Sequence, residues 1–474
     1  MLDGGQDLEP EAQARVTGLA NHDPDHWAPE ARATYMAPQF DPPPGQTRRF
    51  GSDFAQEPLT NTIARAPDGF GLRASRAVGG LSSLWGAAVL PNRTADMADW
   101  PIQAEDLAPH YRAVAGFLPM AGDGAFDALF PALPLAGHSP LPLSPQAQAA
   151  LDHAPDDPGL TIGPARIAVS TECRACGLCL HGCPWGHIFS ARLGLAALRD
   201  HPRFMHRTGP VHSLDERADH VMVRLHDGTT LAAPRVFLGA GVLETARIAL
   251  ASGWAESLTL ADSPHGFLPL LTRRAADPAA QRHTLAALMV EMDIAEISPF
   301  LIHSQIYGYN EFYAPEMAGR YGRILPGLAT PLFNRLSRHL MVAQTFLHSD
   351  HGPEIGLTAA SDGRLNVTIE KETRPAPLMV RAQKELGRAL RRAGLYALTP
   401  AAHTGTAGSS FHVGGTLPMG DKTDILGRPK GLTRTHVIDA SSLPTIAATT
   451  ITLTVMANAH RIGATTPYSV PPET

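Results

Sequence analysis

The clearest regular pattern of hydrophobic and polar residues lies in the middle of the chain. Val221, Val223 and Leu225 occupy every second position, which predicts a strand with one buried face. Asp227-Gly228 follows this run and is typical of a tight turn between two strands. We therefore expect a hairpin that returns the chain to a central sheet.

Two further segments combine a strand with a helix. The run VFLGAG at 236–241 predicts a buried strand ending in glycine, and ETARIALAS at 244–252 has helical spacing. The segment 435–463 predicts a strand, a turn and a helix that opens near Thr450. The start of that helix would place a positive dipole and free backbone N–H groups beside residues 449–452. An electron-rich edge of a ligand could bind there.

The region from about residue 265 to 400 has a different pattern. The runs TLAALMVEMDI at 284–294 and RLNVTIEKE at 364–372 predict strands. A long amphipathic helix with Gly394 as its stop is predicted beside them, because one helical face carries Leu378, Ala382, Leu386, Ala389, Leu390 and Ala393. A sheet with covering helices is the usual form of a substrate domain.

The first part of the chain has little periodicity. Residues 10–73 are rich in proline, glycine and polar residues, including PQFDPPPGQ at 38–46, and predict mostly loops. Before them, Leu2-Asp3-Gly4-Gly5 predicts the end of a strand that carries an acid. After them, the segment 74–91 combines paired glycines with small and hydroxyl residues, which lets backbone approach a ligand closely.

Composition and charge restrict the class of protein. The chain has 474 residues, 44% hydrophobic and 18% charged, so it can bury a large core. A net charge of −6 gives no basic face for nucleic acid, and no apolar run reaches the roughly 18 residues that a membrane span requires. We therefore assign no nucleic-acid partner and no membrane span.

All four cysteines lie in one short segment. Cys173, Cys176, Cys179 and Cys183 have the spacing C-x₂-C-x₂-C-x₃-C-P, which is the bacterial ferredoxin run and predicts an iron–sulfur cluster. Structural zinc on four thiolates and unliganded thiols are the alternatives. A single cluster of cysteines favours a reducing compartment, so we expect a cytoplasmic protein.

Several separated segments, in this order, resemble the glucose-methanol-choline (GMC) family of FAD oxidoreductases. They are VGGLSSLWGAAVLP at 78–91, DWPIQAEDLAPHYRAV at 99–114, VFLGAGVLETARIALAS at 236–252, FHVGGTLPMG at 411–420 and VIDASSLPT at 437–445. The resemblance implies a mixed α/β (α+β) fold with two interleaved domains. Residues 1–264 and 401–474 would form a Rossmann-like FAD-binding domain, and residues 265–400 a substrate domain with an antiparallel sheet and helices.

The resemblance also implies an incomplete start. In a dinucleotide-binding unit the acid on the ribose comes about 20 residues after a G-x-G-x-x-G loop, yet Asp3 has nothing of that kind before it. We expect an N-terminal truncation that removes the first βα unit, and hence poor binding of FAD. Whether this is an error in the assigned start or a real loss is open.

By resemblance, residues from six segments would contact FAD. Asp3 would hold the adenosine ribose, and Val211 would contact the adenine through its backbone. The other contacts would come from Gly79, Gly80, Ser82, Ala240, Gly241, Asp439, Ala440 and Ile451.

Two residues would carry the chemistry. His412 begins an H-x-x-G-T pattern whose histidine faces the flavin in the family, and we expect it to be the catalytic base. Hydride leaves a carbinol carbon for flavin N5 only as the hydroxyl proton is taken up, and imidazole titrates near working pH. The family's second position, a His or Asn, falls on Thr450, which cannot serve as a base. A neighbour such as His403 could assist, whereas His460 is expected to be structural.

The sequence therefore predicts an FAD-dependent dehydrogenase that oxidises CH–OH groups of a sugar, polyol or other alcohol. Some members of the resembled family carry an iron–sulfur cluster that drains electrons from the flavin, which favours an external electron-acceptor protein over oxygen. The alternative is a non-catalytic remnant of a flavoprotein, a subunit with a structural metal loop, which the missing phosphate loop and Thr450 favour.

Overall fold

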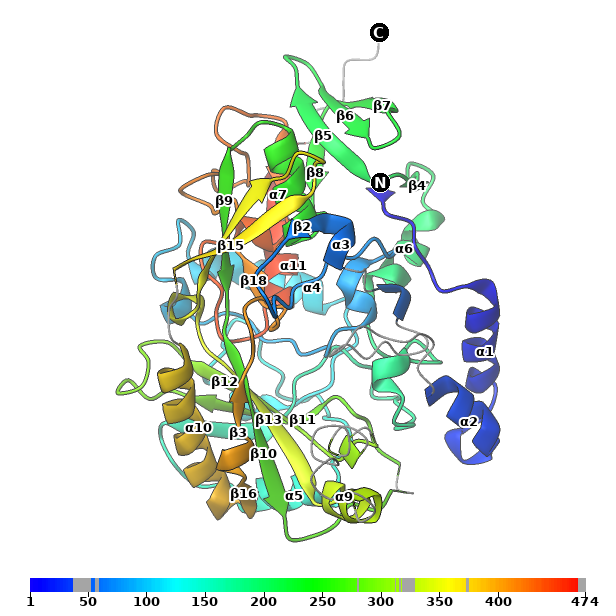
Figure 1. The fold of residues 1–474 in the computed structure, drawn as a ribbon, viewed down its shortest axis with the longest axis vertical. Coiled ribbons are helices and arrows are strands. Elements are labelled where there is room, and N and C mark those ends of the chain that lie inside the picture. Colours follow the sequence, from blue (N-terminus) through cyan, green and yellow to red (C-terminus); the bar gives the residue numbers. More distant parts are fainter. Residues whose placement is uncertain are drawn as a thin grey trace.

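The structure is a computed structural model that describes residues 1–36, 53–55, 59–278, 281–311, 313–314, 317, 329–371 and 375–467. Figure 1 shows an elongated molecule with two tiers. A seven-stranded sheet and its helices form one tier, and several smaller sheets form the other. The N-terminus lies in the tier of smaller sheets, and α1 and α2 run along one side of the molecule.

The seven-stranded sheet is antiparallel throughout, in the order β16-β10-β13-β12-β11-β3 with β17 also paired to β10. Two helices, α5 and α10, pack on one of its faces through a core of apolar side chains. The elements are β3 (Leu160–Pro164), β10 (His265–Thr272), β11 (Ala286–Met292), β12 (Ile302–Tyr307), β13 (Leu340–Phe346), β16 (Leu395–Ala397), β17 (His403–Thr404), α5 (Pro145–Asp152) and α10 (Pro375–Arg392). The opposite face is therefore available to a site.

Helix α10 confirms the predicted amphipathic pattern. Ala382, Leu386 and Leu390 are fully buried against the sheet. Gly394 follows the helix with a φ of +79°, the left-handed conformation in which glycine commonly ends helices.

Two Gly→Ala substitutions, one just after α10 and one inside α6, are expected to act in opposite directions. Gly394→Ala puts a Cβ on a left-handed residue and should lower stability by about 1 kcal/mol. Gly194→Ala lies inside α6 (Ala191–Arg199), where a Cβ meets no neighbour, and should raise stability by about 0.5–1 kcal/mol. Thermal unfolding of both variants checks this, and shifts of equal sign would contradict the assignment of the helix end.

The other tier contains a five-stranded sheet in the order β18-β9-β14-β15-β2. Helix α7 (Val242–Ala251) packs on it through Leu243, Ala246 and Leu250. The strands are β2 (Ile63–Arg65), β9 (Ser257–Asp262), β14 (Glu354–Ala359), β15 (Leu365–Lys371) and β18 (Val413–Gly414). Strands β14 and β15 thus lie inside the predicted range 265–400 but pair in a different sheet from β10–β13. The domain boundaries stay a prediction.

Three small sheets complete this tier. Strands β5 (Val211–Glu216), β6 (Val221–Leu225) and β7 (Thr230–Ala233) form the predicted hairpin and one further strand. Two parallel pairs join β1 (Leu2–Asp3) to β4 (Arg207–Thr208), and β8 (Val236–Leu238) to β19 (Thr435–Val437). The prediction that 236–241 is a buried strand is wrong in part, because Phe237 is 44% exposed and residues 239–241 are also exposed.

The largest apolar core joins the two tiers. It contains residues 87–90, side chains of α4 (Ala104–Ala115), residues 165–169 and the start of α11 (Thr452–Thr465). The α11 bounds confirm the predicted helix near Thr450. The prediction of loops before residue 73 is wrong where α1 (Pro10–Ala20), α2 (Pro29–Met36) and α3 (Leu59–Thr62) form. The segment 38–46 lies outside the described residues.

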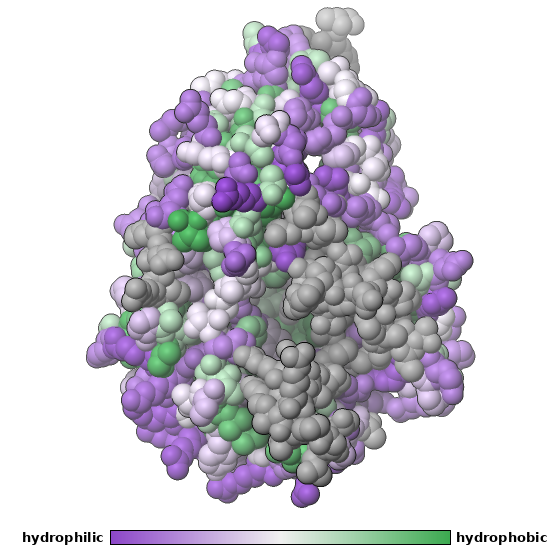
Figure 2. All heavy atoms as spheres, in the orientation of Figure 1, coloured by the Kyte–Doolittle hydropathy of each residue, from purple (hydrophilic) through white to green (hydrophobic). Residues whose placement is uncertain are grey.

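Figure 2 shows that the described surface on this side of the molecule is mainly hydrophilic, with hydrophobic residues in small separate groups. Among the described helices, none has both the length and the apolar character needed to cross a membrane. The small helix α9 (Ala329–Ser337) lies at the edge of the tier that contains the seven-stranded sheet.

Candidate active site and cysteine-lined pocket

The backbone around His412 is held in a fixed and strained conformation. The preceding residue, Phe411, has a φ of +59°, which costs energy in any residue with a Cβ and commonly marks a functional site. The His412 amide donates to Ser410 Oγ at 3.0 Å, and the His412 carbonyl accepts from the Ser263 amide at 3.0 Å. Hydrogen bonds to the amide and to the carbonyl of His412 thus hold the strained backbone in place.

A buried carboxylate anchors the same loop. Asp262, at the end of β9, accepts hydrogen bonds from Ser410 Oγ and from the Gly408 amide, each at 2.7 Å. Burial raises the pKa of Asp262, and the two hydrogen bonds oppose that effect. The sequence analysis missed this residue, although an acid at the end of the apolar run LTLAD was a usable signal.

The His412 ring lies against the side of the seven-stranded sheet that is opposite to α5 and α10. It stacks on Phe346 of β13, with ring centroids 4.5 Å apart and an interplanar angle of 20°. His265 and His303 lie opposite Phe346 on the neighbouring strands. Burial, and then repulsion from His303 and His265, lowers the pKa of His412 to about 3, so the imidazole is neutral near pH 7. A neutral imidazole can accept a proton, but a pKa of about 3 lies far below the range near pH 7 that the sequence led us to expect of the base.

Two buried neutral histidines should make the protein sensitive to acid. Burial lowers the pKa of His265 to about 4, and that of His412 to about 3, from 6.5. Their contribution to stability is complete above pH 6.5 and is lost as the pH falls toward 4, because the unfolded chain then binds protons that the folded chain excludes. We expect the unfolding temperature to fall over this range, and to fall less steeply in His265→Gln. Exposed His138→Gln should keep the wild-type slope, and equal slopes in all three proteins would contradict the assignment.

Asp439 connects two of the predicted cofactor segments. Its carboxylate accepts from the Gly241 amide at 2.9 Å and from Thr245 Oγ1 at 2.5 Å, both at the start of α7, and from the Ser441 amide at 2.9 Å. The Ala440 carbonyl accepts from the Gly415 amide at 3.0 Å. The segment that begins with His412 therefore lies beside the segment 439–441, which in turn lies beside Ala240 and Gly241.

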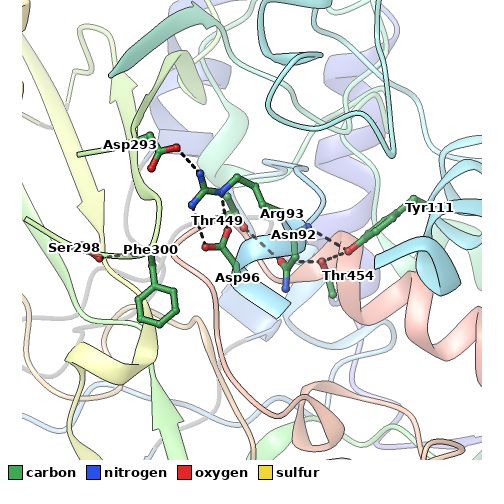
Figure 3. A network of polar contacts seen from close by, with 9 residues as sticks. All are labelled: Asn92, Arg93, Asp96, Tyr111, Asp293, Ser298, Phe300, Thr449 and Thr454. Carbon is green, nitrogen blue, oxygen red and sulfur yellow. Dashed lines mark hydrogen bonds and ion pairs between the residues drawn. The ribbon is translucent and has the colours of Figure 1, made fainter. Parts of the chain in front are cut away.

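The start of α11 is tied to the segment that follows the predicted flavin glycines. Asn92 Oδ1 accepts from Thr454 Oγ1 at 3.1 Å and from Thr449 Oγ1 at 3.5 Å, and Tyr111 contacts both Asn92 and Thr454 (Figure 3). Figure 3 also shows Arg93, the residue after Asn92, which donates to Asp96 and, separately, to Asp293 just after β11. Ile451 occupies the N-cap position of α11, and Thr450 lies between Thr449 and Thr454 in the sequence.

Four buried polar atoms in these segments have no hydrogen-bond partner among the described residues. They are His412 Nδ1, Thr416 Oγ1, Ser441 Oγ and Thr450 Oγ1. Buried polar atoms are almost always hydrogen-bonded, because an unpaired one costs about 1–3 kcal/mol. Four such atoms on adjoining segments point to a bound ligand or ordered water.

The residues predicted for the adenine side gather around another core. Leu2 and Val211 border the apolar core that contains Leu238. Asp3 lies 2.9 Å from His206 Nε2, and the Val211 carbonyl accepts from Arg247. Backbone hydrogen bonds of 2.8–3.0 Å join Gln6 to residues 76 and 78, which brings Asp3 toward Gly79 and Gly80.

Ser82 and Gly79 have local structural roles. Ser82 Oγ donates to the Gly79 carbonyl at 2.6 Å and accepts from the Ala191 amide at 2.9 Å. A Cβ on Gly79 would lie 2.5 Å from the Arg192 amide nitrogen. This glycine turn therefore packs against the start of α6, which follows the cysteine segment.

The four cysteines line one small pocket. Its wall also includes His187, His283 and Trp185, and all four thiols are free. Backbone N–H groups of Ala175, Thr284 and His187 donate to the sulfur atoms of Cys173, Cys179 and Cys183 at 3.3–3.4 Å. Burial raises the pKa of Cys176 to about 12 and of Cys179 to about 11, so the bare thiols are protonated at neutral pH.

A single zinc ion does not fit this pocket. Within the described part of the chain, no three His, Cys, Asp or Glu side chains are close enough to hold one metal ion. Zinc on four thiolates needs all four sulfur atoms about 2.3 Å from one point. Neither the zinc alternative nor the predicted iron–sulfur cluster is therefore supported by a ready-made group of ligands among the described residues. His187 Nε2 and His283 Nδ1 are both buried without a partner, which favours some polar group in or near the pocket.

The pocket and the segment 78–91 are joined through Trp85. Its indole N–H donates to the Phe189 carbonyl at 2.7 Å, and Ile188, the preceding residue, lines the cysteine pocket. Two other predicted histidines lie elsewhere. His403 is exposed and stacks on Phe267, and His460 of α11 contacts His110 of α4, with 2.8 Å between their Nδ1 atoms.

Comparison with known proteins gives two findings. Residues 342–459, which include His412, Asp439 and Thr450, match the family described as GMC oxidoreductase. The fold is similar to that of the structure titled "Crystal structure of pyridoxine 4-oxidase from Mesorbium loti", with a TM-score of 0.61 and 16% identity over 98% of this chain and 93% of that chain. No curated protein matches the sequence significantly. The fold likeness confirms the predicted architecture, a Rossmann-like domain with a substrate domain.

Proposed function

We propose that the protein is an FAD-dependent oxidoreductase of the GMC type that oxidises a CH–OH group. The observation that carries the proposal is the family match over residues 342–459, because that range holds His412 and Thr450 with their unpartnered buried atoms. The similar fold belongs to a pyridoxine 4-oxidase, which is consistent with this reaction class.

The residues present fit FAD. Asp439 already accepts from the Gly241 amide at the start of α7, and the exposed residues 239–241 leave room beside it for part of the cofactor. Gly241 has a φ of +83° with free space where a Cβ would be. The unpartnered Thr416 and Thr450 hydroxyls could donate to a polar ring edge. FAD, when bound, would accept the hydride from the carbinol carbon.

The protein's own part in the reaction is proton removal. His412 is neutral, and its ring is fixed by Phe346 and by the strained backbone at Phe411. It would take the hydroxyl proton of the substrate as the C–H bond breaks. Thr450 would orient the substrate or cofactor by a hydrogen bond and would hold no proton itself.

We further propose that the cysteine pocket holds an iron–sulfur cluster. In a cluster each thiolate binds a different iron, so the four sulfur atoms need not converge on one point as they would around a single ion. The N–H groups that donate to Cys173, Cys179 and Cys183 would stabilise the thiolates. Together with an electron-acceptor protein, the cluster would make the protein a dehydrogenase.

Anaerobic mixing of the FAD-loaded protein with alcohols tests the proposed function. Loss of the flavin absorption on addition of an alcohol, and its return on addition of an artificial electron acceptor, is the expected result. A protein that takes up no flavin, or whose flavin no alcohol reduces, would leave the non-catalytic remnant as the better account.

A further inference from the structure

A row of hydrogen-bonded side chains lies on the face of the seven-stranded sheet that is opposite to α5 and α10. It consists of Glu291 on β11 and His303, Gln305 and Tyr307 on β12, and we name it the polar relay. The three β12 residues occupy alternate positions and so share one face. Glu291 lies opposite His303, and Phe346, on which His412 stacks, lies opposite His303 on the other side. The polar relay thus begins next to the proposed base.

Its members are buried although they are polar. Glu291 is 1%, His303 0% and Gln305 3% exposed. Burying this many polar groups on one face of a sheet is costly unless they are hydrogen-bonded, and a purely structural face would carry apolar residues, as the opposite face does. The polar relay therefore calls for a functional explanation.

The hydrogen bonds of the polar relay all run in one direction. Tyr307 donates its hydroxyl proton to Gln305 Oε1 at 2.6 Å. Gln305 Nε2 lies 3.1 Å from His303 Nε2, and an amide nitrogen can only donate, so His303 Nε2 accepts. His303 then carries its proton on Nδ1 and donates to Glu291 Oε1 at 2.6 Å. Tyr307 has used its only proton, so its oxygen is left as an acceptor.

The acceptor end faces the segment that resembles a flavin loop. A Cβ built on Gly86 would lie 3.7 Å from the Tyr307 oxygen, and it would meet no other atom within 4 Å. Gly86 follows Trp85 in the segment 78–91. The polar relay thus spans the wall between His412 and this segment, where a substrate would lie if the proposed function holds.

We propose that Tyr307 determines substrate specificity by accepting a hydrogen bond from a second hydroxyl group of the alcohol. Glu291, His303 and Gln305 are positioning residues that fix the Tyr307 proton away from the substrate. The inference rests on the proposed function and narrows its substrate class to polyols, since an alcohol with one hydroxyl has no donor left for Tyr307.

Matched alcohols test the subsite. The probes are n-propanol with glycerol, and cyclohexanol with myo-inositol, each pair sharing a carbon skeleton. In the FAD-loaded wild type, kcat/KM should be about tenfold higher for the polyol of a pair, the value of one hydrogen bond. Tyr307→Phe should bring this ratio close to one while the activity on the simple alcohol is kept. Tyr396→Phe, at the sheet edge, is the matched control and should leave the ratio unchanged.

The ratio of kcat/KM values is independent of a general folding defect, because such a defect lowers both rates and leaves their ratio unchanged. Two further variants are therefore judged by the same ratio. Glu291→Gln removes the charge that orders the relay and should lower the ratio partly. Gly86→Ser puts a hydroxyl beside the Tyr307 oxygen and should lower it with Tyr307 intact. An equal rate for both alcohols in the wild type, or an unchanged ratio in Tyr307→Phe, would overturn the subsite alone. Failure of the wild type to oxidise any of the four alcohols would count against the proposed function itself.

Discussion

Replacing His412 by asparagine is expected to lower the rate of alcohol oxidation by about 10²- to 10⁴-fold, the usual contribution of a general base. Asparagine keeps a planar polar side chain but cannot accept a proton at neutral pH. FAD binding should be unchanged, because the contacts of residue 412 with Ser263 and Ser410 are made by its backbone. Stopped-flow reduction of the flavin by substrate measures the rate directly.

The matched control for this variant is His138→Asn, which changes an exposed histidine. It should reduce flavin at the wild-type rate. Retained turnover in His412→Asn would remove His412 from its role and would make His303, which also stacks on Phe346, the next candidate.

Replacing Cys179 by serine is expected to remove the iron–sulfur cluster completely or nearly so. Its sulfur borders the pocket with the other three and accepts from the Thr284 amide, and serine oxygen is a poor ligand for such a cluster. The anaerobically purified wild type should contain about four iron and four sulfide per chain. Iron, sulfide and zinc analysis of both proteins checks this.

If Cys179→Ser does not fold, the iron, sulfide and zinc content of the wild type alone tests the proposed cluster. A metal-free wild type would leave four buried thiols as a structural feature. Zinc without iron would favour structural zinc on the four thiolates, for which the described side chains show no ready-made site. In a cluster-free variant, flavin reduction by substrate should persist, while transfer of electrons to an external acceptor protein should slow.

Periodicity predicted those elements whose burial repeats along the chain. The stripe of α10 and the alternation in β6 specified a helix and a strand because each packs one face on a large core. Helices α1 and α2 were missed since α1 contributes only Val16 and Leu19 to a small core with Leu178. The exposure of Phe237 was also missed, because a strand's own sequence does not reveal which neighbours it pairs with.

The candidate site divides in the same way. Residues inside recognisable segments, such as His412, Gly241 and Asp439, could be named from the sequence. Asp262, Phe346 and Glu291 could not, because their roles come from contacts between strands far apart in the chain. Strand register decides those contacts, and it is set by tertiary packing.

Titration of the protein with FAD, followed by quenching of flavin fluorescence, tests the central claim most directly: that the segments around Gly241, His412, Asp439 and Thr450 surround one flavin. The sequence led us to expect poor binding of FAD, so we predict binding that is weak but saturable at about one FAD per chain. It should be weakened further by Gly241→Val at the start of α7 but not by Gly228→Val, a glycine of similar φ in the remote β6–β7 turn. Fluorescence that never saturates, or equal weakening by both variants, would contradict the account.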